Sequence, residues 1–238
     1  HTEGKESVML RGVDNNKDQT YFLCQLNQNQ LNNSLFPIGE LTKPEVRQIA
    51  EELELPVAHK KDSTGICFIG ERDFREFLKN YIPAKSGKMV DIVSKKVIGE
   101  HQGIMYYTIG QRKGLGIGGN GEPWFVVGKD YDKNILYIAQ GDSNKWLLSH
   151  GALITDVNWI SATKPEGEYD CTAKFRYRQK DNDVSLHFID ETTLYVTFKK
   201  PIKAVTPGQA AVFYDGDVCL GGGTIDKVYK DGKEIDYL

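Results

Sequence analysis

A single cysteine, Cys67, lies in a short apolar stretch with Gly65 two residues before it and Gly70 three residues after it. Glycine permits sharp turns and close approach of other groups, which suits a thiol that reacts more than one that only packs. Residues 71–82 have helical spacing, so the thiol is expected just before a helix N-terminus, where the helix dipole favours the thiolate. The pattern predicts a nucleophilic or redox-active cysteine. The alternative is an inert buried thiol, the usual state of a free cysteine.

A second group of residues has the chemistry to bind phosphates. Lys174, Arg176 and Arg178 alternate with apolar residues, which predicts a basic row on the outer face of one strand. An ordinary solvated strand face would show the same pattern. Tyr177 falls on the apolar side of that strand, so a core position competes there with a binding one.

The composition limits the class of protein. The chain has 238 residues, 39% of them hydrophobic and 26% charged, and a net charge of −3. It is long enough to bury a core, and any nucleic-acid surface must be a local patch. No run of about 18 apolar residues occurs, so no membrane-spanning helix is expected. The four cysteines form no Cys-x-x-Cys pair and the histidines have no ligand spacing, so we expect no metal site, and free thiols favour a cytoplasmic location. Cys24 and Cys219 lie in apolar runs and Cys171 on an inward strand face, so all three are expected in the core.

The chain divides into three expected domains, with an α+β, mainly β, fold class. Residues 1–72 are expected to end an α/β domain, because Thr42 and Glu45 form a capping-box pattern before an amphipathic helix, and residues 55–58 look like a short strand. Residues 73–146 are expected to form a small β-rich domain, and residues 147–238 an antiparallel β-barrel or sandwich. The expected strands are 88–93, 96–99, 124–128, 135–139, 169–177, 184–188, 194–198, 211–214 and 218–221.

Residues 114–119 also match the G-x-G-x-x-G pattern of dinucleotide-binding loops. That motif needs a strand before it and a helix after it. Here turn residues at 120–123 lead into an expected strand, so we interpret the glycines as part of a loop. The neighbouring Arg112 and Lys113 either face RNA or only solvate this loop.

Several stretches, taken together and in this order, resemble the bacterial tRNA-specific 2-thiouridylase family. They are residues 16–23 (NKDQTYFL), 62–70 (DSTGICFIG), 107–116 (YTIGQRKGLG), 174–179 (KFRYRQ), and 206–214 (TPGQAAVFY) followed by 219–223 (CLGGG). The likeness runs from near residue 10 to near residue 225.

The resemblance implies a tRNA-uridine 2-sulfurtransferase. In this family, ATP with Mg²⁺ adenylates O2 of the wobble uridine, and a cysteine persulfide then delivers sulfur to the carbon. Cys67 would be one of the two cysteines involved, as the persulfide or the resolving thiol. The implied partners are a tRNA with a modifiable wobble uridine and a sulfur-donating cysteine desulfurase or relay protein. No membrane partner is implied.

The resemblance also implies tRNA contacts by Lys17, Asp18, Gln19, Arg176, Tyr177 and Gln209. The residues themselves leave another interpretation open for the first three, because Asp18 and Thr20 are both good caps for a helix that begins at Tyr21. Gln209 follows a Pro-Gly turn, which is expected to present its amide at a loop tip.

The sequence departs from the family at its beginning. The pyrophosphatase-type nucleotide loop and the first catalytic cysteine have no match, so the chain corresponds to the C-terminal two-thirds of such an enzyme: the tail of the catalytic domain, the central domain and the barrel. Alone it is expected neither to bind ATP nor to turn over. Two alternatives remain, a non-enzymatic RNA-binding β-barrel module and a redox-sensing thiol protein.

Overall fold

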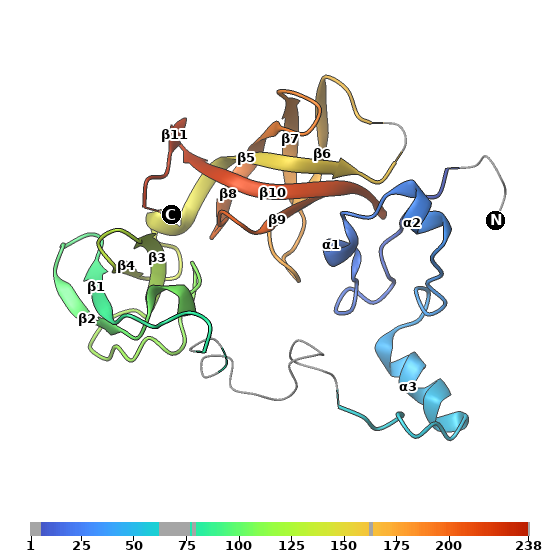
Figure 1. The fold of residues 1–238 in the computed structure, drawn as a ribbon, viewed down its shortest axis with the longest axis horizontal. Coiled ribbons are helices and arrows are strands. Elements are labelled where there is room, and N and C mark those ends of the chain that lie inside the picture. The colour runs from blue at the N-terminus through green and yellow to red at the C-terminus, as the bar shows by residue number, and fades with distance from the viewer. Residues whose placement is uncertain (1–5, 62–76, 78–79, 162–163, 238) are drawn as a thin grey trace. The chain divides into compact units, whose positions relative to one another are not determined.

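The computed structural model describes residues 6–61, 77, 80–161 and 164–237 (Figure 1). These residues belong to two compact units. The first joins His1–Lys60 to Ser149–Glu234, and the second joins Lys61–Leu148 to Ile235–Leu238. No helix among the described residues is long and apolar enough to cross a lipid bilayer. The mainly β character expected from the sequence is confirmed.

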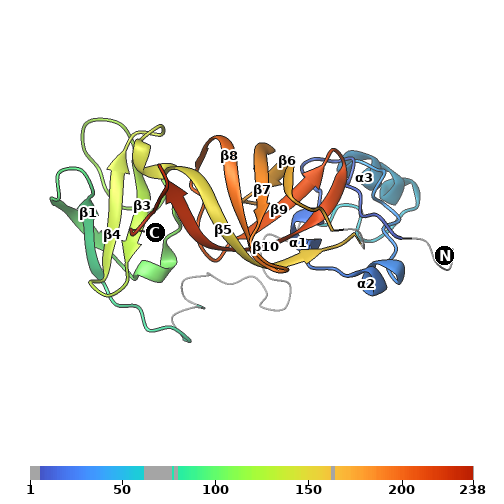
Figure 2. The same cartoon turned by 90° about the horizontal axis from the view of Figure 1, so that it is seen from above.

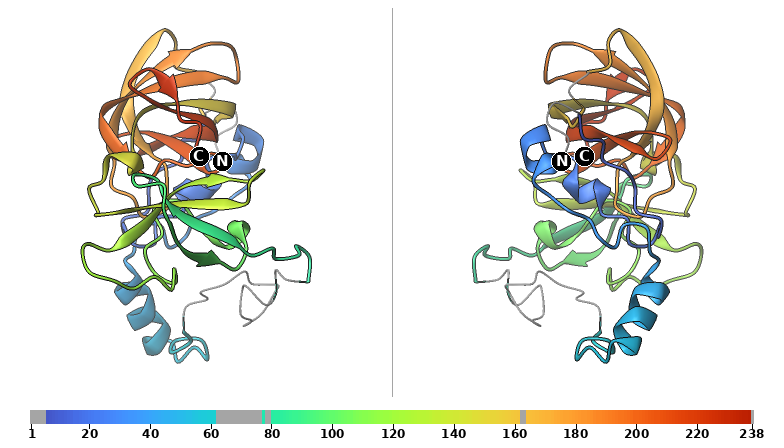
Figure 3. Two further views of the ribbon diagram at one scale, coloured as in Figure 1. Left: turned by 90° about the vertical axis from the view of Figure 1, so that its left-hand side faces the viewer. Right: turned by 90° about the vertical axis from the view of Figure 1, so that its right-hand side faces the viewer.

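Six strands of the first unit close into a barrel (Figures 2 and 3). They are β5 (Leu148–Trp159), β6 (Glu168–Lys174), β7 (Asn182–Phe188), β8 (Leu194–Lys203), β9 (Ala210–Asp215) and β10 (Val218–Lys230). The order is β10-β5-β8-β7-β6-β9, and β9 pairs back onto β10 to close the ring. The short β11 (Lys233–Glu234) forms a hairpin with the end of β10. Five of the six barrel strands correspond to strands expected from the sequence, whereas β5 corresponds to none of them.

Strand β10 is long because it pairs with β9 along its first half and with β5 along its second. The crossing point is the run Gly221–Gly223. A Cβ at Gly221 would lie 2.1 Å from the carbonyl oxygen of Asn158, and one at Gly222 would lie 2.5 Å from that of Ala211. The triple glycine in the sequence is therefore explained by backbone approach inside the barrel wall.

The N-terminal segment covers the outer face of β9 with two short helices, α1 (Thr20–Leu23) and α2 (Gln28–Asn32) (Figure 1). Residues of this segment share one apolar cluster with the barrel: Met9, Tyr21, Cys24, Leu31, Ile160, Val212, Tyr214 and Cys219. Backbone bonds reinforce the contact, because the Cys219 amide donates to the Met9 carbonyl oxygen at 2.9 Å. The segment and the barrel therefore have a common core.

Beside this apolar cluster lies a buried group of charges. The guanidinium carbon of Arg11 is 3.7 Å from the centre of the Tyr214 ring, and its NH2 atom is 3.0 Å from Asp181 Oδ2. Lys174 Nζ lies 3.9 Å from carboxylate oxygens of both Asp18 and Asp181. The side chains of Arg11, Lys174 and Asp18 are largely closed to water, and Asp181 lies at the exposed edge of the group. Two cations thus face two anions, the arrangement that makes buried charge tolerable.

The helix α3 (Lys43–Glu52) begins with the expected capping box. The Thr42 amide donates to Glu45 Oε2 at 2.6 Å, and the Lys43 amide donates to Asp14 Oδ2 at 2.9 Å. No residue of α3 is buried, although its spacing is amphipathic. The strand expected at residues 55–58 is wrong: Leu55 is irregular and the other three residues form turns, because the described part of the chain offers them no strand to pair with.

The second unit contains a four-stranded sheet in the order β2-β1-β4-β3. Its strands are β1 (Gly87–Asp91), β2 (Val97–His101), β3 (Trp124–Asp130) and β4 (Ile135–Gln140), close to the expected ranges. A 3-10 turn, η1 (Ile104–Tyr106), follows β2. Tyr237, near the C-terminus, packs here, with its hydroxyl donating to the Trp146 carbonyl oxygen at 3.1 Å. Most of the helix expected at 71–82 lies outside the described residues.

His101 is a fully buried imidazole at the end of β2. Its Nδ1 accepts from the Gly103 amide at 3.2 Å, so Nε2 carries the proton and donates to the Asn134 carbonyl oxygen at 3.1 Å. A second proton on Nδ1 would face another donor. Burial lowers the pKa of His101 below its ordinary value, and the bond to Asn134 opposes this only in part.

We expect the buried charges to be energetically coupled. Lys174→Met leaves the buried Asp18 carboxylate without its cation and is expected to cost about 3 kcal/mol. Asp18→Asn leaves Lys174 with Asp181 as its remaining anion, so this change is expected to cost less. The double variant removes both charges and is expected to cost clearly less than the sum. Urea unfolding of the four proteins measures this coupling. Strictly additive losses would show that the two side chains act independently.

The second unit is expected to lose stability in mild acid. His101 has a lower pKa in the folded chain than in the unfolded one, so its contribution is complete above about pH 6.5 and declines as the pH falls, by at most about 1.4 kcal/mol per pH unit. Urea unfolding between pH 7.5 and pH 5, at roughly unit steps, measures the slope. In His101→Gln this component of the slope should disappear. An unchanged slope would mean that other groups control the acid response.

Candidate nucleic-acid interface

Asp18 is turned inward and holds the loop that carries Lys17 and Gln19. Its Oδ1 accepts hydrogen bonds from the Thr20 amide at 3.1 Å, from the Thr20 hydroxyl at 2.8 Å and from the Gly12 amide at 3.3 Å. The helix α1 begins at Thr20, one residue earlier than expected. Asp18 is only 5% exposed, whereas Gln19 is exposed and Lys17 half-buried. Of the three residues, Asp18 therefore has a structural position and its neighbours lie at the surface.

Tyr177 joins this loop to the barrel. The Gln19 side-chain amide donates to the Tyr177 hydroxyl at 3.0 Å, and that hydroxyl donates to the Asn16 carbonyl oxygen at 3.4 Å. The Tyr177 ring packs against Phe22 with 4.6 Å between ring centres and against Tyr21 with 6.2 Å. The position is half-buried, so the residue is neither a core side chain nor a free one.

Arg176 connects the same region to the turn that presents Gln209. Its NH2 atom donates to the Thr206 hydroxyl at 3.2 Å. The backbone amide of Gln209 donates to the Thr206 carbonyl oxygen at 3.3 Å, and Gly208 between them has a φ of 80°. Gln209 is exposed, as expected for a loop tip. Burial lowers the pKa of Arg176 from its very high ordinary value, and the guanidinium stays charged at neutral pH.

Three distant parts of the chain thus meet on the first unit. We call the surface formed by Lys17, Gln19, Arg176, Tyr177 and Gln209 the recognition surface. Tyr21 lies beneath it, with its hydroxyl donating to the Ala210 carbonyl oxygen at 2.9 Å, and burial raises its pKa to about 12. The buried tyrosine is therefore neutral at neutral pH, and it carries no negative charge that would offset the cations above it.

The basic row expected on one long strand is wrong beyond Lys174. Strand β6 ends at that residue, and the chain turns through residues 175–181 before β7 begins. Lys174 does lie on the outer face, but the N-terminal segment covers it and it is buried. Arg178 adopts a left-handed conformation with φ of 63° in the turn and is exposed. The Gln179 side chain accepts from the Phe175 amide at 2.7 Å and shapes the turn, so the alternation of the sequence beyond Lys174 does not correspond to a strand.

The cysteines differ in accessibility. Cys24 and Cys219 are buried in the cluster beneath β9, which confirms their expected core positions. Cys171 is half-buried. Burial raises the pKa of all three thiols, to about 12 for Cys171 and Cys219, so none of them is a thiolate at neutral pH. Cys67 lies outside the described residues, and its catalytic role stays a prediction.

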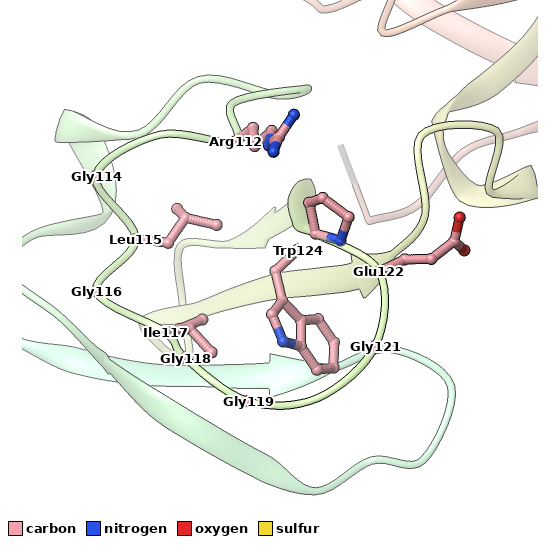
Figure 4. Close-up of a pocket in the computed structure, with 11 residues that line it drawn as sticks. Arg112, Gly114, Leu115, Gly116, Ile117, Gly118, Gly119, Gly121, Glu122 and Trp124 are labelled. Carbon is pink, nitrogen blue, oxygen red and sulfur yellow. The ribbon is translucent and has the colours of Figure 1, made fainter.

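The glycine-rich loop of the second unit surrounds a shallow hollow of about 430 Å³ (Figure 4). Arg112, Leu115 and Trp124 line it together with several glycines. Strand β3 follows the loop directly, so the G-x-G-x-x-G pattern is not a dinucleotide fingerprint, as the sequence indicated. The Gln111 side chain accepts from the Thr108 amide and donates to the Lys113 carbonyl oxygen, which shapes the loop.

Two residues near the recognition surface were not identified as functional from the sequence. Phe22 is 60% exposed beside Tyr177, and the Arg11 guanidinium stacks on Tyr214 beneath the surface. The KDQTYFL stretch contains Phe22, but a run of aromatic and aliphatic residues does not show which ring turns outward. Arg11 stands alone in the sequence and carries no pattern.

Comparison with known proteins gives a consistent assignment for successive parts of the chain. Three family models match: a tRNA methyl transferase HUP domain at residues 1–71, a tRNA methyl transferase PRC-barrel domain at residues 75–140, and an aminomethyltransferase beta-barrel domain at residues 149–225. The expected boundaries at residues 72 and 146 stay a prediction.

Several curated relatives carry the same name. A protein of Bacillus cytotoxicus, named tRNA-specific 2-thiouridylase MnmA, is 60% identical over 233 residues, and proteins of the same name from Bacillus cereus and Bacillus thuringiensis are 59% identical. Each match covers 98% of this chain and 62% of the relative. The chain thus spans about 62% of the length of these relatives. On this identity, and on the three domain matches in order, the chain belongs to the tRNA-specific 2-thiouridylase family.

Proposed function

We propose that this chain is the tRNA-binding part of an ATP-dependent tRNA-uridine 2-sulfurtransferase, which replaces O2 of the wobble uridine with sulfur. The observation that carries the proposal is the recognition surface. The Gln19 side-chain amide donates both to the Lys17 carbonyl oxygen and to the Tyr177 hydroxyl. Arg176, the residue before Tyr177, donates to the Thr206 hydroxyl, and the Gln209 backbone amide donates to the Thr206 carbonyl oxygen.

The chemistry of this surface suits a folded RNA. Lys17 and Arg176 supply cations for phosphates. The Gln19 side-chain nitrogen donates to Lys17 and Tyr177, so its carbonyl oxygen is the acceptor that it offers to an RNA, whereas the Gln209 side chain offers a donor and an acceptor for base edges or 2′-hydroxyls. The net charge of −3 does not favour general binding to nucleic acid, so a local cationic patch with amides favours a defined RNA. Asp18 acts in this proposal by positioning its two neighbours.

Cys67 supplies the reactive sulfur position in the proposed reaction. The terminal sulfur of a cysteine persulfide attacks C2 of the adenylated uridine and expels AMP. A second cysteine thiolate then attacks the inner sulfur, so that the C2 thiocarbonyl is released and a disulfide forms between the two cysteines. A cellular thiol reductant returns that disulfide to two thiols. Cys67 is one member of the pair, either the persulfide or the resolving thiol.

The other components of the proposal belong to the whole protein. ATP with Mg²⁺ activates the uridine oxygen, and a cysteine desulfurase or a sulfur-relay protein loads the persulfide. The reaction takes place in the cytoplasm, where free thiols persist. The three cysteines with raised pKa values support the assignment of sulfur chemistry to Cys67, because buried neutral thiols are poor nucleophiles.

The alternative function is a non-enzymatic RNA-binding β-barrel module. It accounts for the recognition surface but gives no role to Cys67 and its glycines. The names of the relatives, which match 98% of this chain including that stretch, favour the sulfurtransferase.

The test combines two proteins. The first is this 238-residue chain, titrated with tRNA. The second is a chimera that joins the chain to the part of the Bacillus cytotoxicus relative outside the match, assayed for 2-thiouridine by mass spectrometry of digested tRNA. We expect Cys67→Ser to abolish thiolation in the chimera and to leave tRNA binding by the chain unchanged. We expect Lys17→Ala to weaken binding and to lower the slope of log affinity against log salt by about one.

Cys171→Ser is the matched control, since it makes the same substitution at a half-buried thiol and should leave thiolation intact. Binding by the chain with no thiolation by a folded chimera would support the RNA-binding module instead. Thiolation that survives in Cys67→Ser would remove Cys67 from the mechanism.

A further inference from the structure

Phe22 is a largely exposed aromatic ring at the edge of the recognition surface. It lies in α1 between the buried Tyr21 and the half-buried Leu23, and 60% of it is accessible to solvent. A single exposed apolar residue is ordinary in a folded protein. Phe22 differs because it belongs to an ordered group of aromatic rings and has cationic and amide groups around it.

Two neighbouring tyrosines hold the ring in place. Tyr21 meets it edge-on, with 5.4 Å between ring centres and an interplanar angle of 88°, and Tyr177 packs against it at 4.6 Å and 45°. Both tyrosines are themselves tethered, Tyr21 to the Ala210 carbonyl oxygen and Tyr177 to the Gln19 amide. A ring whose supports are fixed loses little conformational entropy when a ligand covers it.

The charges around these rings favour a polyanion as the ligand. The Arg178 guanidinium carbon lies 5.3 Å from the centre of the Tyr177 ring and the residue is exposed. Arg176 precedes Tyr177 in the chain, and its positive charge acts on the Tyr21 hydroxyl. The Gln19 side-chain amide that donates to Tyr177 also donates to the Lys17 carbonyl oxygen at 3.3 Å, which brings Lys17 to the same loop. Single-stranded RNA is recognised by this combination, in which bases stack on aromatic faces while arginine and lysine meet the backbone. An aromatic anchor for another protein needs no such accumulation of positive charge.

We propose that Phe22, supported by Tyr177, is a stacking platform for one unpaired base of the bound RNA. The inference rests on the proposed tRNA-binding function and adds a contact to it. Every base has an aromatic face, so the platform contributes affinity for any unpaired base at that position, and sequence preference comes from the amides of Gln19 and Gln209.

The experiment titrates the 238-residue chain with an RNA hairpin that carries 2-aminopurine, a fluorescent base, at one unpaired loop position. A series of hairpins places the fluorescent base at each loop position in turn, and a fully paired RNA duplex serves as the reference ligand. Phe22→Leu keeps an apolar side chain but removes the aromatic face, whereas Phe22→Trp keeps an aromatic face. Phe36→Leu makes the same change at another exposed phenylalanine, 51% accessible, in the same unit.

We expect Phe22→Leu to weaken hairpin binding by roughly five- to hundred-fold, the range for loss of one stacked base. The fluorescence quenching at one loop position should disappear, while the salt slope stays as in the parent chain, because no phosphate contact is lost. Phe22→Trp and Phe36→Leu should retain both affinity and quenching, and duplex binding should be the same in all variants.

The outcomes are distinguishable. Hairpin affinity and quenching that remain unchanged in a folded Phe22→Leu protein would overturn the platform and leave the proposed tRNA-binding function standing. A parent chain that binds no hairpin would contradict both. If Phe22→Leu changes only the self-association of the chain, measured by sedimentation, the ring is a protein contact and the platform is wrong. Should Phe22→Leu fail to fold, loss of quenching can be tested by Tyr177→Leu, and quenching that persists there would overturn the platform.

Discussion

The outer face of β9 is the part of the first unit on which its other features depend. Ala211 and Phe213 face the barrel interior, so Val212 and Tyr214 point the other way, yet all four have no exposed surface. The N-terminal segment covers this outer face with an apolar cluster and a group of buried charges. The outer face of β9 needs such a cover because Val212 and Tyr214 would otherwise be exposed to water. Burial of each large apolar side chain stabilises the fold by roughly 1.5–3 kcal/mol.

The same cover orients the recognition surface. Asp18, in the N-terminal segment, turns inward beside Lys174. Its bonds to Thr20 hold the loop so that the residues on either side of Asp18 face the solvent. Lys17 and Gln19 therefore reach the surface where Tyr177 and Arg176 arrive from the turn after β6. Stability and recognition share one set of contacts, so a change at Asp18 is expected to disturb both, whereas a change at Gln19 acts on the surface alone.

Recognition and chemistry have different requirements in this chain. Three side chains of the recognition surface, Gln19, Arg176 and Tyr177, already have hydrogen bonds or ring contacts within the chain, which reduces the entropy lost on binding. Cys24 and Cys219 are buried and neutral, and they stabilise the cluster beneath β9 instead of reacting. Cys171 is half-buried, and burial raises its pKa to about 12. The proposed sulfur chemistry thus depends on the one cysteine that the sequence sets among glycines.

Local patterns in the sequence determined the strands of the second unit, five strands of the barrel, the capping box at Thr42 and Glu45, and the core positions of Cys24 and Cys219. They also identified the residues of the recognition surface, through motif likeness, without saying which would lie together. Only the tertiary structure decided that β6 ends at Lys174, that Lys174 and Asp18 are buried, and that Phe22 is exposed. The physical reason is that period and composition report the immediate neighbours of a residue, whereas burial depends on which distant segment covers it. For Asp18 and Lys174 the two segments are separated by more than half of the chain.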